Sequence, residues 1–420
     1  MYNNIKISDW RQFQDIDINF DEHLTILTGA NGAGKTTILN ILSKPFGRTI
    51  NFVSTPEKDK KTGILKYLTG KFFRRNKDSN IIGMQSAQSL GSISYNSSIY
   101  TITLPNNISN TYSINISNIP VVNGVFISSH RSSFVYKNVT HIPTRALSRK
   151  DIFSSYKDFS SKKELDVYYN PSEIAPTLLI KEALISLATF GYGNQVVEPN
   201  YEATKLFEGY QEILKKVLPP SLGFQSLKIE VPEVILETKS GNFSLDAVSG
   251  GIASIIELTW QIYMYDDPQN KFIVIMDEPE NHLHPELQRT LLPNLIESFP
   301  NVQFIVATHN PFVISSVDTS QVYVLNYNDE NKVVSYKLDQ INKNGTANDI
   351  LRDVLGIQST IPIWANNKLQ SIIHKYSSLE INSTNISKLR QELIDEGFDN
   401  IIPQIIIDVL EEGKNDDKNN

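Results

Sequence analysis

Residues 29–36, which read GANGAGKT, constrain the fold of this chain more than any other segment. They match the pattern G-x-x-x-x-G-K-[ST], whose glycines let backbone N–H groups turn toward the phosphates of a nucleotide. Alternating apolar residues at 24–28 predict a strand that runs into the loop, and the apolar spacing at 36–42 predicts a helix that leaves it. Because a helix N-terminus favours anions, this order predicts a nucleotide-binding α/β fold.

Two side chains of this loop carry most of its expected chemistry. Lys35 is expected to reach the β- and γ-phosphates of ATP, and Thr36 is expected to ligate Mg²⁺. The loop and helix residues expected to contact the nucleotide are Asn31, Gly32, Ala33, Gly34, Lys35, Thr36 and Thr37. The sequence therefore predicts ATP and Mg²⁺ as cofactors.

An acidic pair follows the most apolar stretch of the second half of the chain. Residues 271–276 predict a parallel strand covered on both faces, and this strand ends in Asp277 and Glu278. A carboxylate at a strand end beside the phosphate loop is where the second protein ligand of the metal belongs, which favours Asp277. Glu278 is then the natural general base for the attacking water.

Two weaker signals gain meaning from their spacing. Ser249, Gly250 and Gly251 precede a predicted helix at 252–263, and alone they would indicate a plain turn and helix cap. Their position upstream of Asp277 favours a functional role over a plain turn. His309 follows a predicted strand at 304–307, and its distance from Asp277 favours a γ-phosphate sensor over a structural histidine.

Taken together, these motifs resemble the Walker A, signature, Walker B and switch-histidine motifs of ABC-type ATPases. Within the RecF, SMC and OLD group of AAA ATPases, the resemblance is closest to the RecF- and OLD-like branch, where D-E-P-E-x-x-L-H-P and T-H-x-P are typical, and it extends to residues 350–356. It implies a P-loop fold of the α/β class with a mixed central sheet, an antiparallel β subdomain, an inserted helical subdomain and C-terminal helices.

The resemblance also implies how the site is completed. In this group two copies sandwich two nucleotides head to tail, so Ser249 of one copy would contact the γ-phosphate bound to Lys35 of the other. The chain is therefore expected to form a homodimer or a higher homo-oligomer. ABC enzymes also carry a glutamine that senses Mg²⁺ and the attacking water. Gln85 is the first candidate for it and Gln88 the second.

Other parts of the chain depart from the known branches. The residues between Lys35 and Ser249 lack the sustained heptads of SMC arms, and the residues after His309 lack the motifs of the TOPRIM nuclease domain found in OLD proteins. These departures make the chain most similar to the stand-alone ATPase subunits of Septu- and PARIS-like anti-phage systems.

The pattern along the chain predicts five parts. They are an ATPase lobe with a β subdomain at 1–150, a helical insertion at 151–222, a second ATPase lobe at 223–345, a helical region at 346–412 and a disordered tail at 413–420. The chain has no cysteine, no signal-peptide pattern and no apolar run long enough for a membrane span, so it is expected to be cytoplasmic and not membrane-bound.

Charge leaves two functions open. The net charge is −7, yet residues 58–150 hold 13 Lys or Arg against two Asp, which fits either DNA or an acidic protein partner. The favoured hypothesis is an ATP-gated switch or scaffold that senses a trigger and controls a separate effector, a nuclease or toxin, in anti-phage defence. The alternative is a RecF- or SMC-like ATPase that acts directly on DNA in repair or processing.

Overall fold

The computed structural model divides the chain into two compact units, Met1–Ile350 and Leu351–Asn420. The five-part division expected from the sequence stays a prediction. The structure describes residues 1–58, 63, 65–68, 88–105, 109–131, 134–143, 147–165, 175–266, 270–339, 347–355, 362–377 and 383–398.

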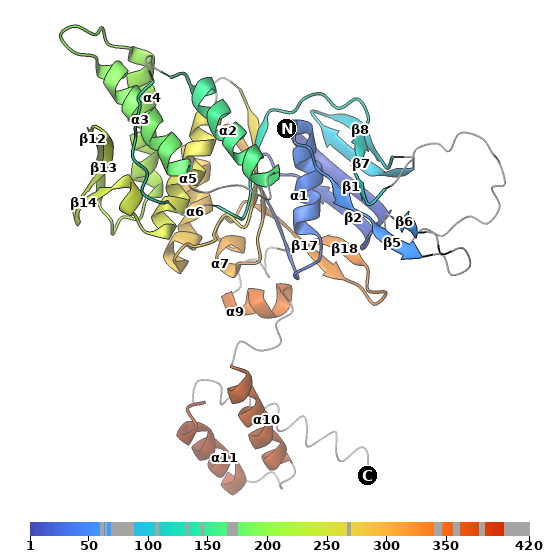
Figure 1. Ribbon diagram of the computed structural model, residues 1–420. Coiled ribbons are helices and arrows are strands. Elements are labelled where there is room, and N and C mark those ends of the chain that lie inside the picture. The colour runs from blue at the N-terminus through green and yellow to red at the C-terminus, as the bar shows by residue number, and fades with distance from the viewer. Residues whose placement is uncertain are drawn as a thin grey trace, which may run out of the picture. The chain divides into compact units, whose positions relative to one another are not determined.

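A mixed β-sheet forms the centre of the first unit (Figure 1). Its strand order is β10 (Asn115–Ile116), β8 (Ser98–Thr103), β7 (Ser89–Tyr95), β1 (Tyr2–Trp10), β2 (Phe13–Asn19), β18 (Val333–Lys337), β17 (Gln321–Tyr327), β3 (Leu24–Gly29), β16 (Val302–Ala307), β15 (Phe272–Asp277) and β11 (Gly124–Ile127). The five strands from β17 to β11 run parallel, whereas β1, β2, β7, β8 and β10 pair antiparallel. The predicted α/β class with a mixed central sheet is confirmed.

The sequence pattern explains why the two halves of the sheet differ. Every residue of β3, β15 and β16 is buried, as expected for parallel strands covered on both faces. In β1 and β2, buried and exposed residues largely alternate, so one face of this half is open to water. The antiparallel strands predicted within 93–116 are present and extend this same sheet.

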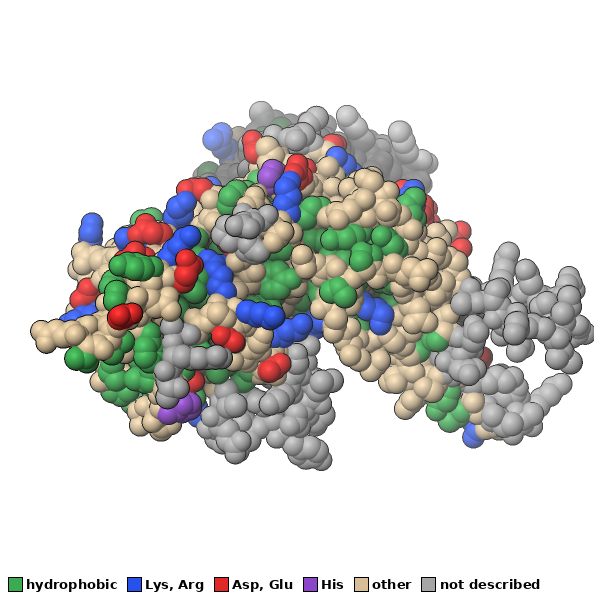
Figure 2. All heavy atoms as spheres, turned by 90° about the horizontal axis from the view of Figure 1, so that it is seen from above, with side chains coloured by type: hydrophobic (Ala, Val, Ile, Leu, Met, Phe, Trp, Pro, Cys, Tyr) green, Lys and Arg blue, Asp and Glu red, His purple; other side chains and the backbone are tan. Residues whose placement is uncertain are grey.

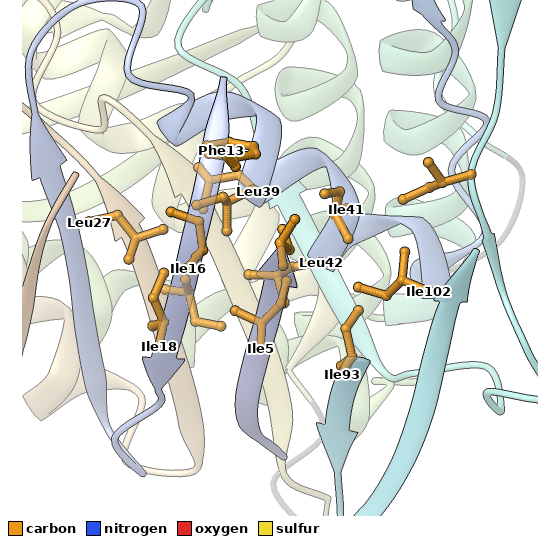
Figure 3. Close-up of a cluster of buried hydrophobic side chains, with 14 of the residues drawn as sticks. Ile5, Phe13, Ile16, Ile18, Leu27, Leu39, Ile41, Leu42, Ile93 and Ile102 are labelled. Carbon is orange, nitrogen blue, oxygen red and sulfur yellow. The ribbon is translucent and has the colours of Figure 1, made fainter. Parts of the chain in front are cut away.

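Some helices of the first unit pack on the central sheet, and others lie beside it (Figure 1). Within the described ranges of the first unit they are α1 (Lys35–Ser43), α2 (Arg149–Leu165), α3 (Pro176–Tyr192), α4 (Tyr201–Val217), α5 (Gly250–Tyr265), α6 (Pro285–Ser298), α7 (Pro311–Ile314) and α9 (Ala347–Asp349). Figure 3 shows Leu39 and Leu42 of α1 lying over Ile5 and Ile16 of the sheet, in the main hydrophobic core. This packing fixes the start of α1 at the end of β3.

Smaller sheets complete the first unit. β12 (Phe224–Glu230), β13 (Glu233–Thr238) and β14 (Gly241–Ser244) form an antiparallel sheet beside α3 and α4 (Figure 1). Two-stranded sheets pair β4 (Phe52–Val53) with β9 (Thr111–Tyr112) and β5 (Thr55–Lys58) with β6 (Leu65–Leu68). No helix within the described ranges is long and apolar enough to cross a membrane.

The second unit includes most of a π-helical turn, Ile350–Val354, and the helices α10 (Ile363–Ser377) and α11 (Ser383–Asp395). Their apolar residues form a small core of their own, made of Ala365, Leu369, Ile372, Ile373, Tyr376, Leu389, Leu393 and Phe398. Helix α10 was predicted at 366–376 and is present. The second half of the helix predicted at 386–410 and the tail predicted at 413–420 lie outside the described residues.

A buried ion cluster joins α3 to the sheet β12–β14. Nζ of Lys181, whose side chain is fully buried, lies 2.6 Å from Oδ2 of Asp246 and 2.7 Å from Oε2 of Glu233. Burial disfavours the charge of Lys181, but the hydrogen bonds with Asp246 and Glu233 raise its pKa. Asp246 lies in a 3₁₀ turn, Leu245–Ala247, just before Ser249.

Substitution of Lys181 by Met is expected to lower the free energy of unfolding of the first unit by about 3 kcal/mol, because it leaves the buried Asp246 carboxylate without its cation. Lys215→Met is the matched control, since Lys215 is exposed and pairs with the exposed Glu212, and it should cost less than about 1 kcal/mol. Urea unfolding followed by tryptophan fluorescence measures both. Equal losses in the two variants would contradict the prediction.

Candidate nucleotide and metal site

The phosphate loop joins β3 to α1. A Cβ at Gly29 (φ 131°) would lie 2.1 Å from the backbone oxygen of Leu325, so only glycine lets β3 pass β17 here. The N-cap position of α1 is Gly34 (φ 96°), and no side chain caps the helix. The first backbone N–H groups of α1 are therefore available to an anionic ligand.

Lys35 is buried within the loop that it follows. Its Nζ donates to the carbonyl oxygens of Gly29 at 2.8 Å and Ala30 at 3.2 Å, and the residue is 8% exposed. Burial lowers the pKa of Lys35, and the nearby charges of Glu278 and Asp277 oppose that shift. The ammonium group thus lies near both the loop backbone and the acidic strand end, and its contact with the phosphates stays a prediction.

Thr36 in the first turn of α1 contacts Asp277 at the end of β15. Oγ1 of Thr36 donates to Oδ2 of Asp277 at 2.9 Å, and burial raises the pKa of Asp277 while this hydrogen bond opposes the rise. Two neighbouring ligands of an octahedral Mg²⁺ ion, each about 2.1 Å from the metal, lie about 3 Å apart. The two oxygens therefore have the separation and the chemistry that Mg²⁺ requires.

Glu278 occupies a strained position directly after β15. Its φ of 46° lies in the left-handed region, which costs a non-glycine residue roughly 1–2 kcal/mol, and its N–H donates to the carbonyl of Ala307 at 2.8 Å. Its Oε1 lies 3.1 Å from Nδ1 of His309, and its Oε2 accepts from Nδ2 of Asn281 at 3.1 Å. Contacts on both oxygens hold the carboxylate in one orientation at the end of the sheet.

His309 follows β16, whose neighbour in the sheet is β15. The contact with Glu278 brings together the two side chains predicted to act on the water and the γ-phosphate. The side chain of His309 is 52% exposed, so its ring can reach a ligand from the solvent side. The role of His309 as a sensor stays a prediction.

The residues predicted as the signature lie at the start of α5. Ser249 is the N-cap residue but makes no capping hydrogen bond, and both Ser249 and Gly250 are exposed. A Cβ at Gly251 would lie 3.1 Å from the carbonyl oxygen of His282, so α5 begins against the turn that follows β15. The Ser249–Gly250 start of α5 is therefore open to solvent, and its role as a signature stays a prediction.

The glutamine expected from the resemblance is not placed at the site. Gln85 lies outside the described residues. Gln88 precedes β7, where its carbonyl accepts a hydrogen bond from Leu104, in the antiparallel half of the sheet. The assignment of Gln85 stays a prediction.

Sequence reasoning missed β11 and the residues that follow it. β11 pairs in parallel with β15, with Ile127 opposite Met276, so residues 128–131 emerge at the same edge as Asp277. His130 lies near enough to Asp277 to oppose the rise that burial causes in the pKa of Asp277, and Arg131 reaches the turn after β15. The local signal was the apolar run at 125–127, which is shorter than the roughly 4–8 residues that indicate a buried strand.

Two family models match the chain. One, described as an AAA domain, matches residues 4–217, and the other, described as "AAA domain, putative AbiEii toxin, Type IV TA system", matches residues 179–315. Between them they contain the phosphate loop, Ser249–Gly251, Asp277, Glu278 and His309.

Three curated proteins are similar in sequence. The Septu protein PtuA of Bacillus thuringiensis is 23% identical over 85% of this chain and 84% of its own length. The retron Ec83 probable ATPase of Escherichia coli is 24% identical over 77% of this chain and 71% of its own length. The retron Vc95 probable ATPase of Vibrio cholerae serotype O1 biovar El Tor is 35% identical over 118 residues, so this chain spans only 22% of that protein.

Among solved structures, two heads of the SMC type resemble the chain. An Smc head domain with an extended coiled coil, derived from Pyrococcus furiosus, has a TM-score of 0.44 at 14% identity and covers 80% of this chain and 96% of its own. The SMC head domain of Thermotoga maritima has a TM-score of 0.40 at 14% identity, over 80% and 99%. Scores of this size do not establish a shared fold. The match at residues 4–217 spans half of the 420 residues and includes the GANGAGKT loop, and the chain therefore belongs to the AAA domain family of ATPases.

Proposed function

We propose that two copies of this chain close on two ATP molecules and that the closed pair controls a separately encoded effector in anti-phage defence. The observation that carries the proposal is the geometry at the ends of β15 and β16. There Oγ1 of Thr36 lies 2.9 Å from Oδ2 of Asp277, and Oε1 of Glu278 lies 3.1 Å from Nδ1 of His309. These contacts support ATP hydrolysis at this edge of the sheet, because phosphoryl transfer uses a bound metal ion and a group that orients the attacking water.

Each side chain has a distinct part in the proposed reaction. Bound by Thr36 and Asp277, Mg²⁺ would neutralise charge on the β- and γ-phosphates. Lys35 would donate to the oxygens of both phosphates, and His309 would contact the γ-phosphate. Glu278 would accept a proton from water as the water oxygen bonds to the γ-phosphorus and the bond to the β-phosphate oxygen breaks, which yields ADP and phosphate.

Closure by a second copy follows from the exposed start of α5. Ser249 and Gly250 are exposed, and no side chain caps the N-terminus of α5. The backbone N–H groups there would suit the γ-phosphate of a nucleotide held by another copy. Hydrolysis would then depend on assembly, because neither copy contains a complete site.

The link to defence rests on the relatives. A protein named for the Septu system aligns with 85% of this chain, and proteins named as retron ATPases align with other shares of it. The motifs of this chain also resemble those of stand-alone defence ATPases, and that resemblance implies a companion protein that supplies the toxic activity. We therefore assign the chain the regulatory half of a two-part system.

Direct action on DNA receives less support from the described residues. Much of the basic part at 58–150 lies outside them, and two of its arginines, Arg131 and Arg149, bond to groups within the chain. On the face in Figure 2, Lys and Arg side chains are interspersed with Asp and Glu.

Phage challenge with the neighbouring gene present tests the proposed function. The tagged chain is expected to retain the product of that gene through purification, and Lys35→Ala is expected to abolish protection of the bacteria. Lys44→Ala is the control, because Lys44 lies at the other end of α1, donates to Ser113 at 2.7 Å and should leave protection intact. A purified chain that processes DNA fully on its own would contradict the effector role.

A further inference from the structure

Arg131 joins two elements that are far apart in the sequence. Its Nε donates to Oγ of Ser254 on α5 at 2.9 Å. Its Nη2 donates to the carbonyl oxygens of Pro279 at 2.8 Å and Asn281 at 3.2 Å, both in the turn that follows β15. One guanidinium group therefore ties the helix that starts with the signature residues to the turn that starts with Glu278.

The guanidinium group of Arg131 is half-buried and lies near two buried carboxylates. Its Nη1 is buried and has no hydrogen-bond partner among the described residues, which is a costly arrangement. Burial lowers the pKa of Arg131, and the buried carboxylates of Glu257 and Glu280 attract its charge and oppose that shift. Because arginine stays protonated in proteins, α5 and the turn share one half-buried cation.

Hydrogen bonds also connect the turn after β15 to His309 and to the residue before it. Glu280 is 3% exposed and accepts a hydrogen bond from the hydroxyl of Thr308, the residue before His309. Glu278, two residues before Glu280, contacts His309 itself. Arg131 is therefore linked to His309 through Asn281, which Arg131 contacts, and through Glu278, which contacts both Asn281 and His309.

On the other side, Arg131 reaches the residues that would serve the second nucleotide. Ser254 lies in the second turn of α5, whose first residues follow Ser249. A planar guanidinium can reach three acceptors at once, whereas an ammonium on a flexible stem cannot hold the same geometry. A shift of the turn would therefore move the start of α5 with it.

We propose that Arg131 is a positioning residue that couples the two nucleotide sites of the dimer, by fixing the Ser249–Gly251 end of α5 relative to the turn after β15. This inference rests on the proposed two-copy arrangement. Among the described residues, Arg131 forms no hydrogen bond with the phosphate loop or with Lys35. Its loss should therefore spare ATP binding by a single copy and weaken closure of the pair.

The experiment compares variants in a background that carries Glu278→Gln, with fluorescent ATP as the probe. Arg131→Met is expected to change ATP affinity of the single copy by less than about twofold and to raise the dimer dissociation constant about tenfold or more, as the loss of hydrogen bonds to a charged group implies. Sedimentation at several protein concentrations measures the dimer. With Glu278 restored, the Hill coefficient of ATP hydrolysis should fall to about one.

Two further variants separate positioning from general support of α5. Arg149 bonds to the opposite end of the same helix, through the carbonyls of Tyr263 and Asp266, so Arg149→Met should leave the dimer constant unchanged. Ser254→Ala removes one acceptor of Arg131 without removing a buried charge, and it should weaken the dimer by about threefold even where Arg131→Met fails to fold.

The outcomes distinguish the coupling from the proposed function. If the Glu278→Gln parent does not dimerise with ATP, the two-copy arrangement itself is wrong. If the parent dimerises and Ser254→Ala and Arg131→Met dimerise equally well, Arg131 does not couple the sites. A loss of single-copy ATP affinity that matches the loss of dimer, or an equal loss in Arg149→Met, would reduce Arg131 to a structural residue and overturn the inference.

Discussion

Replacement of Glu278 by Gln is expected to leave a chain that binds ATP, hydrolyses it at least about a hundredfold more slowly and accumulates as an ATP-bound dimer. General base catalysis contributes roughly 10²–10⁴ in rate, and an amide cannot accept the proton of the attacking water. The amide can still keep contacts with Asn281 and His309, and it is no more strained at φ 46° than the carboxylate. The geometry of the site should therefore survive the change.

Phosphate release measures the rate, and sedimentation with ATP measures the dimer. Glu286→Gln is the matched control, since Glu286 is an exposed carboxylate in the first turn of α6 and its loss removes the same charge nearby. This control should hydrolyse ATP at the rate of the unaltered chain. A rate for Glu278→Gln equal to that of the control would show that another group activates the water.

Replacement of Lys35 by Ala is expected to weaken ATP binding at least about a hundredfold. The ammonium group is the cation of the loop, and each hydrogen bond to a charged group contributes about 1.5–3 kcal/mol, so the loss of two such bonds to phosphate oxygens is large. The change also removes the donor that the carbonyls of Gly29 and Ala30 share. Calorimetric titration measures the affinity, and Lys44→Ala at the other end of α1 should bind ATP normally.

Mixing two inactive variants tests whether each ATP site is built from residues of two copies. A pair formed by one copy with Lys35→Ala and another with Ser249→Arg has one site with both changes and one site with neither. Hydrolysis is therefore expected to recover to as much as half when the two are mixed. No recovery in a sample that contains the mixed dimer would argue against a site shared between copies.

The sequence predicted the pieces of the site that depend on local pattern. The helix after the phosphate loop, the buried strand that ends in Asp277 and the strand before His309 all lie where their apolar spacing places them. Such elements are readable because hydrophobic periodicity and turn residues act over a few positions. The antiparallel strands at 93–116 were also readable, although their union with the central sheet was not.

The sequence could not reveal which strands become neighbours. β11 has only four residues and lies far from β15 in the chain, yet it pairs with β15 in parallel and brings His130 and Arg131 to the edge that holds Asp277. Nothing in the sequence around Arg131 distinguishes it from the other basic residues at 58–150. Its position between α5 and the turn after β15 depends on groups contributed by three separate segments.

By itself, then, the sequence determined that this chain holds a phosphate loop, an acidic strand end and a histidine after a neighbouring strand, because each is encoded within a few consecutive residues. Only the tertiary structure decided that Thr36 meets Asp277, that His309 meets Glu278 and that Arg131 bridges α5 and the turn. Strand order and side-chain contact arise from the packing of the whole sheet against its helices, and that packing is cooperative over long range.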